Sequence, residues 1–220
     1  LDSYAVKLMF GDWLWWDDDT NGTMLVPPQA FVAGLLGGLS PERSSLNKEL
    51  YGVVGSQKAG LVAAGTSQTY SSAELSALFA AGIDVICNPA PGGSYWAVRG
   101  GINTSSDDVT DDDSYTRLTN YIAETLNTGM GAFVGEVIST TLFGDIRAVL
   151  LGTLSNMAGN GILASASWAV VCDATNNPQA ETALGYVRAD VQVRYQGINR
   201  FFVVNLQGSA SVTLATATAS

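Results

Sequence analysis

The sequence contains no histidine among its 220 residues, and its two cysteines, Cys87 and Cys172, lie far apart. Without an imidazole there is no Ser-His-Asp or Cys-His catalytic arrangement and no histidine-based transition-metal site. Two separated cysteines in apolar surroundings form neither a disulfide framework nor a zinc site, and they favour a reducing compartment. These absences predict a protein with no catalytic residues, no metal and no cofactor.

Charge is also scarce, at 14% of residues, and it is unbalanced, because 20 acidic and 10 basic side chains give a net charge of −10. An acidic surface without a basic run repels phosphates and anionic headgroups, so nucleic acid and membrane surfaces are poor partner predictions. No apolar run approaches the ~20 residues that span a bilayer, which predicts no membrane insertion. The 47% of apolar residues indicates a folded protein. Because the chain begins at Leu1, we expect an upstream portion outside this sequence.

The N-terminal half has the succession of helix, glycine and buried strand that is typical of an α/β layer. Ser71 and Glu74 have the spacing of a capping box at a helix start, and Gly82 is placed to end that helix in a left-handed conformation. The other expected elements are a strand at 7–16, an acidic turn at 17–22, a helix at 28–38, a buried strand at 83–87 and a neighbouring strand at 96–99.

Residues 100–114 are polar and acidic, and we interpret them as a domain boundary. Beyond it we expect a helix at 115–128 with Gly129 as its stop, a short strand at 132–137, a helix at 141–158, and strands at 168–172, 187–195, 201–206 and 211–214. The apolar positions assigned to the second helix are Leu142, Ile146, Val149, Leu150, Leu154 and Met157. The 187–195 strand alternates without a break, which predicts one wet face. The charge-free stretch 213–220 suits an arm that pairs with another chain, or a frayed terminus.

Three segments match known ligand-binding motifs only in part. The acidic turn at 17–22 matches the first half of an EF-hand loop, but Pro28 stands where a bidentate Glu is required, which favours a solvated hairpin turn. Residues 129–131 and 55–59 match dinucleotide and phosphate loops incompletely. The carboxylate cluster at 107–113 is expected to be solvated, because general acid catalysis needs a buried carboxyl group.

A series of short segments is more informative when taken in order. They are VPP at 26–28, VAG at 32–34, LYGVVG at 50–55, AGIDVI at 81–86, PGG at 91–93, YWAVRG at 95–100, TSSD at 104–107, YTRL at 115–118, CDATNNP at 172–178 and FFVVNL at 201–206. In this order the sequence resembles the contractile tail sheath proteins of bacteriophages, R-type pyocins and related injection systems.

The resemblance implies an α/β protein of mixed α+β type. Residues 1–108 would be the end of a subtilisin-like α/β sheath domain, 109–207 an α+β C-terminal domain with an antiparallel or mixed sheet, and 208–220 a C-terminal arm. In this family the likeness to subtilisin is one of fold, with no protease activity, and the missing histidine agrees with that independently. Family members also exchange terminal arms, so that strands from neighbouring subunits complete one sheet.

The resemblance also implies a function, a location and partners. The chain would be a structural subunit, not an enzyme, that polymerises around a tail tube and contracts to drive the tube through the host envelope. It would lie in the tail sheath of a virion, after assembly in the bacterial host cytoplasm. Its partners would be other sheath subunits in a helical array and the tail tube protein, with no cofactor.

Candidate interface residues fall into two groups. Arg147, Arg188 and Arg194 are expected on wet surfaces, where they would meet carboxylates of the tube or of a neighbouring subunit. The arm residues Ser211, Val212, Thr213 and Leu214 are expected to pair with a neighbour. Two other classes stay open: a serine-hydrolase relic, and a secreted β-rich adhesion or calcium-binding module.

Overall fold

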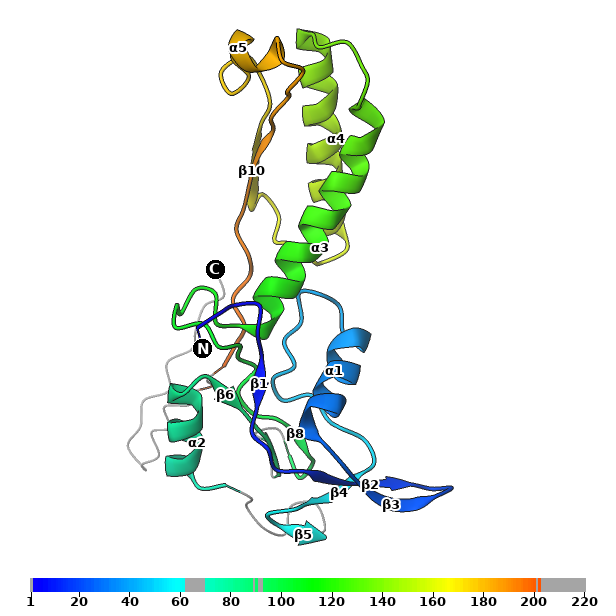
Figure 1. The fold of residues 1–220 in the computed structure, drawn as a ribbon, viewed down its shortest axis with the longest axis vertical. Helices are drawn as coiled ribbons and strands as arrows, with labels where there is room; N and C mark the ends of the chain where they lie inside the picture. The colour runs from blue at the N-terminus through cyan, green and yellow to red at the C-terminus, as the bar shows by residue number, and fades with distance from the viewer. Residues whose placement is uncertain (1, 62–69, 89, 91–92, 201, 203–220) are drawn as a thin grey trace, which may run out of the picture.

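A computed structural model describes residues 2–61, 70–88, 90, 93–200 and 202. These residues form an elongated molecule with a lower part of short strands and two helices, and an upper part dominated by two long helices (Figure 1). The chain after the last strand returns from the upper part to the lower one (Figure 1). The mixed α+β class predicted from the sequence is confirmed, and the sheets are small.

The lower part contains three small sheets. Strands β2 (Leu14–Asp18), β3 (Gly22–Val26), β4 (Val53–Ser56) and β5 (Gly60–Leu61) form a four-stranded sheet in the order β3-β2-β4-β5, with antiparallel neighbours throughout. Strand β1 (Leu8–Met9) pairs in parallel with β6 (Ile83–Asp84), and β7 (Ile86–Cys87) pairs antiparallel with β8 (Ala97–Val98).

The single strands predicted at 7–16 and 83–87 are therefore each divided in two. The second division occurs at Val85, whose backbone N–H donates to the neighbouring carboxylate of Asp84 at 2.7 Å. The backbone changes partner at this point, so that β6 and β7 belong to different sheets. The neighbouring strand expected at 96–99 is confirmed as β8, beside β7.

Two helices cover these sheets. Helix α1 (Pro28–Gly38) begins with a proline in its first turn and ends where predicted. Helix α2 (Ser72–Ala80) has the predicted capping box, with the Ser71 hydroxyl accepting from the Glu74 N–H and the Glu74 carboxylate accepting from the Ser71 N–H. Gly82 has a φ of +69°, as predicted for the residue that ends this helix.

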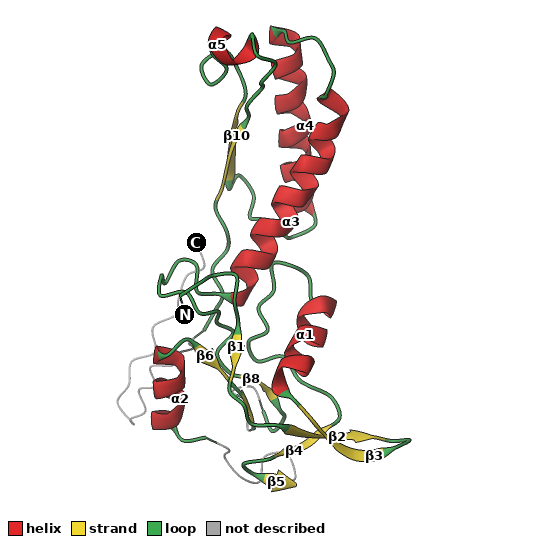
Figure 2. Cartoon of the chain, viewed as in Figure 1, coloured by secondary structure: helices red, strands yellow, loops and turns green. Residues whose placement is uncertain are grey.

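The upper part is a helical pair packed against one face of a strand pair (Figure 2). Helix α3 (Asp113–Met130) and helix α4 (Thr140–Gly159) are joined through a short 3-10 helix, η1 (Gly131–Phe133). Strand β9 (Trp168–Val171) pairs antiparallel with β10 (Asp190–Val193), and a short helix, α5 (Gln179–Thr182), lies in the connection between them. The core of the upper part is buried between the helices and the strands, and it includes Leu118, Ile122, Ile146, Leu150, Leu154, Met157 and Val170.

Three predictions for this region were wrong. Helix α3 continues through Gly129, and the strand expected at 132–137 is instead η1 and a turn, in which Val134 and Val137 are exposed. Val149 is also exposed, although it was assigned to the apolar face of α4. Before this region, the carboxylate cluster at 107–113 is solvated in part as expected, because Asp107 and Asp108 are exposed whereas Asp113 is buried.

Candidate functional site

The strand pair β9–β10 has one buried face and two open edges. Val187, Ala189, Val191, Val193 and Tyr195 pack against the helical core, while the intervening residues are exposed, as the predicted alternation requires. Within the described residues no further strand pairs with either β9 or β10. The outer edges therefore present backbone N–H and C=O groups that another strand can bind.

Two asparagines hold the connection between these strands in place. The Asn177 amide donates to the backbone oxygens of Asp173 and Arg188, and its oxygen accepts from the Arg188 N–H at 2.6 Å. The Asn176 amide donates to the Val171 oxygen at 2.9 Å and to the Asp190 carboxylate at 2.8 Å. The CDATNNP segment that contributed to the sequence resemblance thus fixes the end of the strand pair.

The three candidate arginines do not form one cluster. Arg188 and Arg194 lie on the outer face of the strand pair, both exposed, and Arg188 forms an ion pair with Glu181 at 3.4 Å. Arg147 is exposed on α4. The pKa of Asp173 is lowered chiefly by the hydrogen bond from the Thr175 hydroxyl, and to a smaller extent by the charge of Arg147. Ser211, Val212, Thr213 and Leu214, and the strands expected at 201–206 and 211–214, lie outside the described residues, Phe202 excepted.

A buried ionic junction, which sequence reasoning missed, joins the two parts of the molecule. The ammonium group of Lys7 donates to the carboxylates of Asp84 at 2.5 Å and Asp113 at 3.0 Å, and to the Ile102 backbone oxygen at 2.9 Å. Asp113 also accepts from the hydroxyls of Ser44 and Ser45. Because Asp113 is the first residue of α3, these bonds anchor the start of the long helix in the lower part.

Asp84 is the centre of this junction and is completely buried. Besides Lys7, its carboxylate accepts from the backbone N–H groups of Gly100 at 2.7 Å and Gly101 at 2.8 Å. Gly101 has a φ of +66°, and a Cβ atom there would lie 2.5 Å from the Ser44 hydroxyl, so only glycine fits. The sequence contains one signal for this junction, because the single carboxylate in the apolar run AGIDVI, that of Asp84, requires a partner when it is buried.

Two arginines add further ties between the parts. The Arg200 guanidinium donates two hydrogen bonds to Asp111, at 2.6 and 2.7 Å, and two to Asp112, and these hydrogen bonds, chiefly those to Asp111, raise the pKa of Arg200. Arg117 of α3 donates to the backbone oxygens of Leu36, Leu39 and Arg43, at and beyond the end of α1. The negative end of that helix dipole favours a cation at this place.

The two cysteine side chains are buried and are not activated as nucleophiles. Burial raises the pKa of the Cys87 thiol to about 11 and also raises the pKa of Cys172, so both thiols are protonated near neutral pH. Among the described residues no group of three or more acidic or cysteine side chains is arranged to hold a metal ion. The acidic turn at 17–22 is the predicted hairpin turn, with Asn21 donating to Asp18.

Comparison with known proteins gave matches in structure only. No family model matches the sequence, and no curated protein matches it. A chain of the helical sheath of the anti-feeding prophage in its contracted state superimposes with a TM-score of 0.75 and 17% identity over 93% of this chain and 56% of its own. A chain of the PVC extracellular contractile injection system, in its contracted sheath complex, superimposes with a TM-score of 0.77 and 15% identity. This match covers 96% of the present chain and 58% of the other. A sheath tail protein from Listeria innocua superimposes with a TM-score of 0.56 and 13% identity, over 77% of the present chain and 40% of its own.

The chain therefore has the fold found in the sheaths of contractile injection systems and phage-type tails. The sequence resemblance and the structural matches agree on this fold. The chain spans a little over half the length of the first two sheath-complex chains described above. No described helix combines the length and apolar character required to cross a bilayer.

Proposed function

We propose that this chain is part of a structural subunit of a contractile tail sheath, which polymerises around a tail tube and contracts to drive the tube through a host envelope. The observation that carries the proposal is a match over more than nine-tenths of the chain to sheath proteins, with TM-scores of 0.75 and 0.77. Such a subunit acts by rearranging its contacts with other copies, so no catalytic residue or cofactor is required. We place the subunit in the tail of a virion or a related particle, after assembly in the host cytoplasm.

The open edges of β9 and β10 support a strand-exchange mode of assembly. A strand from a neighbouring copy that adds to either edge would gain a ladder of backbone hydrogen bonds, which do not depend on side-chain identity. Such ladders hold neighbours together while side-chain contacts are remade during contraction. Residues 208–220 are the arm we assign to this pairing, through Ser211, Val212, Thr213 and Leu214.

The separation of the hydrophobic clusters supports the proposed domains, 1–108 and 109–207. The clusters of the lower part draw on residues between Met9 and Val98, whereas the upper cluster draws on residues between Leu118 and Tyr195. We assign the lower part to the end of a subtilisin-like sheath domain and the upper part to the sheath C-terminal domain. Exposed Arg147, Arg188 and Arg194 would then meet carboxylates of the tube or of a neighbouring subunit.

The first prediction concerns assembly of the protein in the longest form that its gene encodes. Expressed without other tail proteins, it is expected to form tubes or helical filaments, because sheath subunits carry the contacts that hold them to their own copies. Negative-stain electron microscopy and sedimentation would detect these polymers. A protein that stays monomeric across protein concentrations and salt conditions would contradict the proposed function.

The second prediction concerns the arm. Deletion of residues 208–220 is expected to leave a folded monomer that no longer forms tubes, because the edges of the strand pair lose the strand that pairs with them. Sedimentation would measure the loss of polymers, and far-UV circular dichroism would check the fold. As a control, alanine replacement of Val134 and Val137, which are exposed in the loop before α4, tests whether any loss of apolar surface has the same effect. Normal tubes from the deletion would refute the role of the arm.

A further inference from the structure

Basic side chains are few in this protein, and they are unevenly distributed. Of its ten lysines and arginines, four line one cavity of about 550 Å³, namely Arg43, Lys48, Arg99 and Arg200, and Glu42 is the acidic side chain in that lining. The cavity lies between the 42–48 loop and the returning segment 198–202. Because the chain has a net charge of −10, this cavity is a local concentration of positive charge on an acidic protein.

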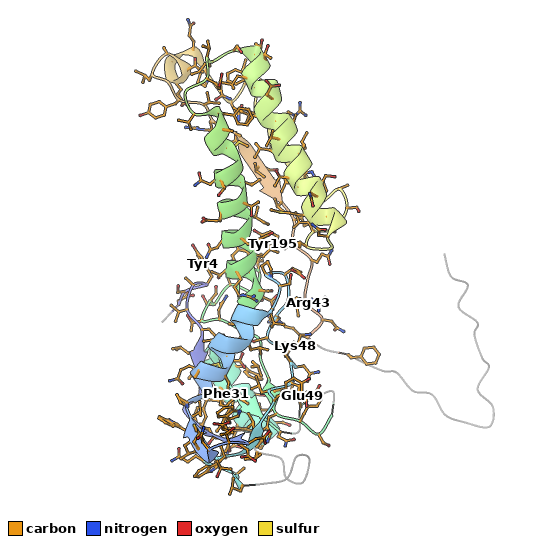
Figure 3. The ribbon with its side chains drawn as sticks, turned by 90° about the vertical axis from the view of Figure 1, so that its right-hand side faces the viewer. Tyr4, Phe31, Arg43, Lys48, Glu49 and Tyr195 are labelled. Carbon is orange, nitrogen blue, oxygen red and sulfur yellow. The ribbon has the colours of Figure 1, made fainter. Side chains whose placement is uncertain are left out.

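Three of these four cations are available to an added anion. Arg200 is occupied by Asp111 and Asp112, as described above. Arg43 has a side chain that is 66% exposed and contacts only the adjacent Glu42, at 3.5 Å, and no carboxylate of the described residues lies within ion-pair distance of Lys48 or Arg99. Arg43 and Lys48 lie near each other, midway along the molecule (Figure 3). The cavity thus offers an anion-binding site with positive charges from separate segments of the lower part.

An acidic hairpin projects from the same chain. The β2–β3 hairpin extends away from the base of the lower part (Figure 1), and the first three residues of β3 are exposed. Its tip carries Asp17 and Asp18, at the end of β2, and Asp19, in the turn; Asp17 and Asp19 are exposed and form no ion pair within the described residues. Asp18 accepts from Asn21, which holds the turn in shape.

We propose that the basic cavity binds the acidic hairpin turn of a second copy of the chain, with Asp17 and Asp19 paired to Arg43, Lys48 and Arg99. The hairpin projects from the base whereas the cavity lies midway along the molecule, so the pairing is between copies rather than within one. The inference rests on the proposed function, because it presupposes a polymer, and it names one contact of that polymer.

This contact has the symmetry that a helical array requires. The hairpin and the cavity are different surfaces, so each copy binds the next head to tail, and such heterologous contacts generate open helical polymers unless the rotation closes a ring. Complementary charges set the orientation and register of neighbours more than they set affinity. A long polyanion such as nucleic acid is a poorer occupant, because the net charge of −10 repels it at a distance.

The test uses two charge reversals in the full-length protein. The cavity variant carries Arg43→Glu and Lys48→Glu, and the hairpin variant carries Asp17→Lys and Asp19→Lys. Each alone places like charges opposite one another, and is expected to raise the critical concentration for polymerisation by at least about tenfold. Glu124→Lys with Glu136→Lys, at exposed positions on α3 and in the loop before α4, changes the net charge as the hairpin variant does and is expected to have a much smaller effect.

Mixing the two variants gives the sharper result. In an alternating copolymer, every second contact pairs the lysines of the hairpin variant with the glutamates of the cavity variant, and the contacts between them pair an unaltered hairpin with an unaltered cavity. An equimolar mixture is therefore expected to assemble with a critical concentration within about threefold of that of the unaltered protein. A variant that had merely lost its fold would not be rescued by mixing, and circular dichroism of each variant provides a second check. Sedimentation measures all of these critical concentrations.

The outcomes separate this inference from the proposed function. Assembly of either variant alone at the unaltered concentration, or failure of the mixture to assemble, overturns the hairpin contact while the sheath function stands. Failure of the unaltered protein to assemble under any condition overturns both. If the cavity instead holds phosphate or another segment of the protein, the hairpin variant assembles normally, which also counts against the contact.

Discussion

Replacing Asp84 by asparagine is expected to lower the free energy of unfolding by about 3 to 5 kcal/mol. The completely buried carboxylate accepts hydrogen bonds from Lys7 and from the backbone N–H groups of Val85, Gly100 and Gly101. The asparagine amide would place its own N–H donors against these N–H donors. It would also leave the Lys7 ammonium with one buried carboxylate partner, that of Asp113. Removal of one partner from a buried ion pair is costly for this reason.

Urea unfolding, followed by far-UV circular dichroism and by tryptophan fluorescence, would measure this change. Asp107→Asn, at an exposed carboxylate, is the matched control and is expected to change the free energy by less than about 0.5 kcal/mol. The double variant Lys7→Met with Asp84→Asn is expected to cost less than the sum of the single variants by about 1 kcal/mol, because the two side chains interact directly. Additive costs, or an Asp84→Asn variant as stable as the control, would show that the junction does not stabilise the fold.

Local signals in the sequence predicted most of the helices and strands. The capping box at Ser71, the proline at the start of α1 and the alternation at 187–195 each depend on a few neighbouring residues. The capping box and the proline are confirmed, and burial alternates over 187–195 as predicted, although only Asp190–Val193 form a strand. The failures have a different origin. Residues 83–87 read as one apolar strand, but the partner changes at Val85 because distant N–H groups of Gly100 and Gly101 converge on Asp84.

The functional surfaces depend even more on contacts between distant residues. The junction brings together Lys7, Asp84 and Asp113, and the basic cavity brings together loop residues and the returning chain. No spacing rule in the sequence relates such residues to one another. The carboxylate cluster at 107–113 was expected to be solvated, and Asp107 and Asp108 are exposed, but Asp113 is buried because Lys7, Ser44 and Ser45 satisfy its carboxylate.

Within helix α4, the apolar face predicted from sequence periodicity can be tested against the packing in the structure. Leu154→Ala is expected to lower the free energy of unfolding by about 3 to 5 kcal/mol, because Leu154 is 0% exposed in the core between the helices and the strand pair, and truncation leaves a cavity there.

Val149→Ala is the control on the same helix and is expected to change the free energy by less than about 0.5 kcal/mol. Its side chain is 39% exposed, and alanine has the higher helix propensity. Sequence periodicity assigned both residues to one apolar face, so equal costs in urea unfolding would favour that assignment over the packing in the structure. A large loss for Leu154 alone would show that Val149 lies outside the core that packs between the helices and the strand pair.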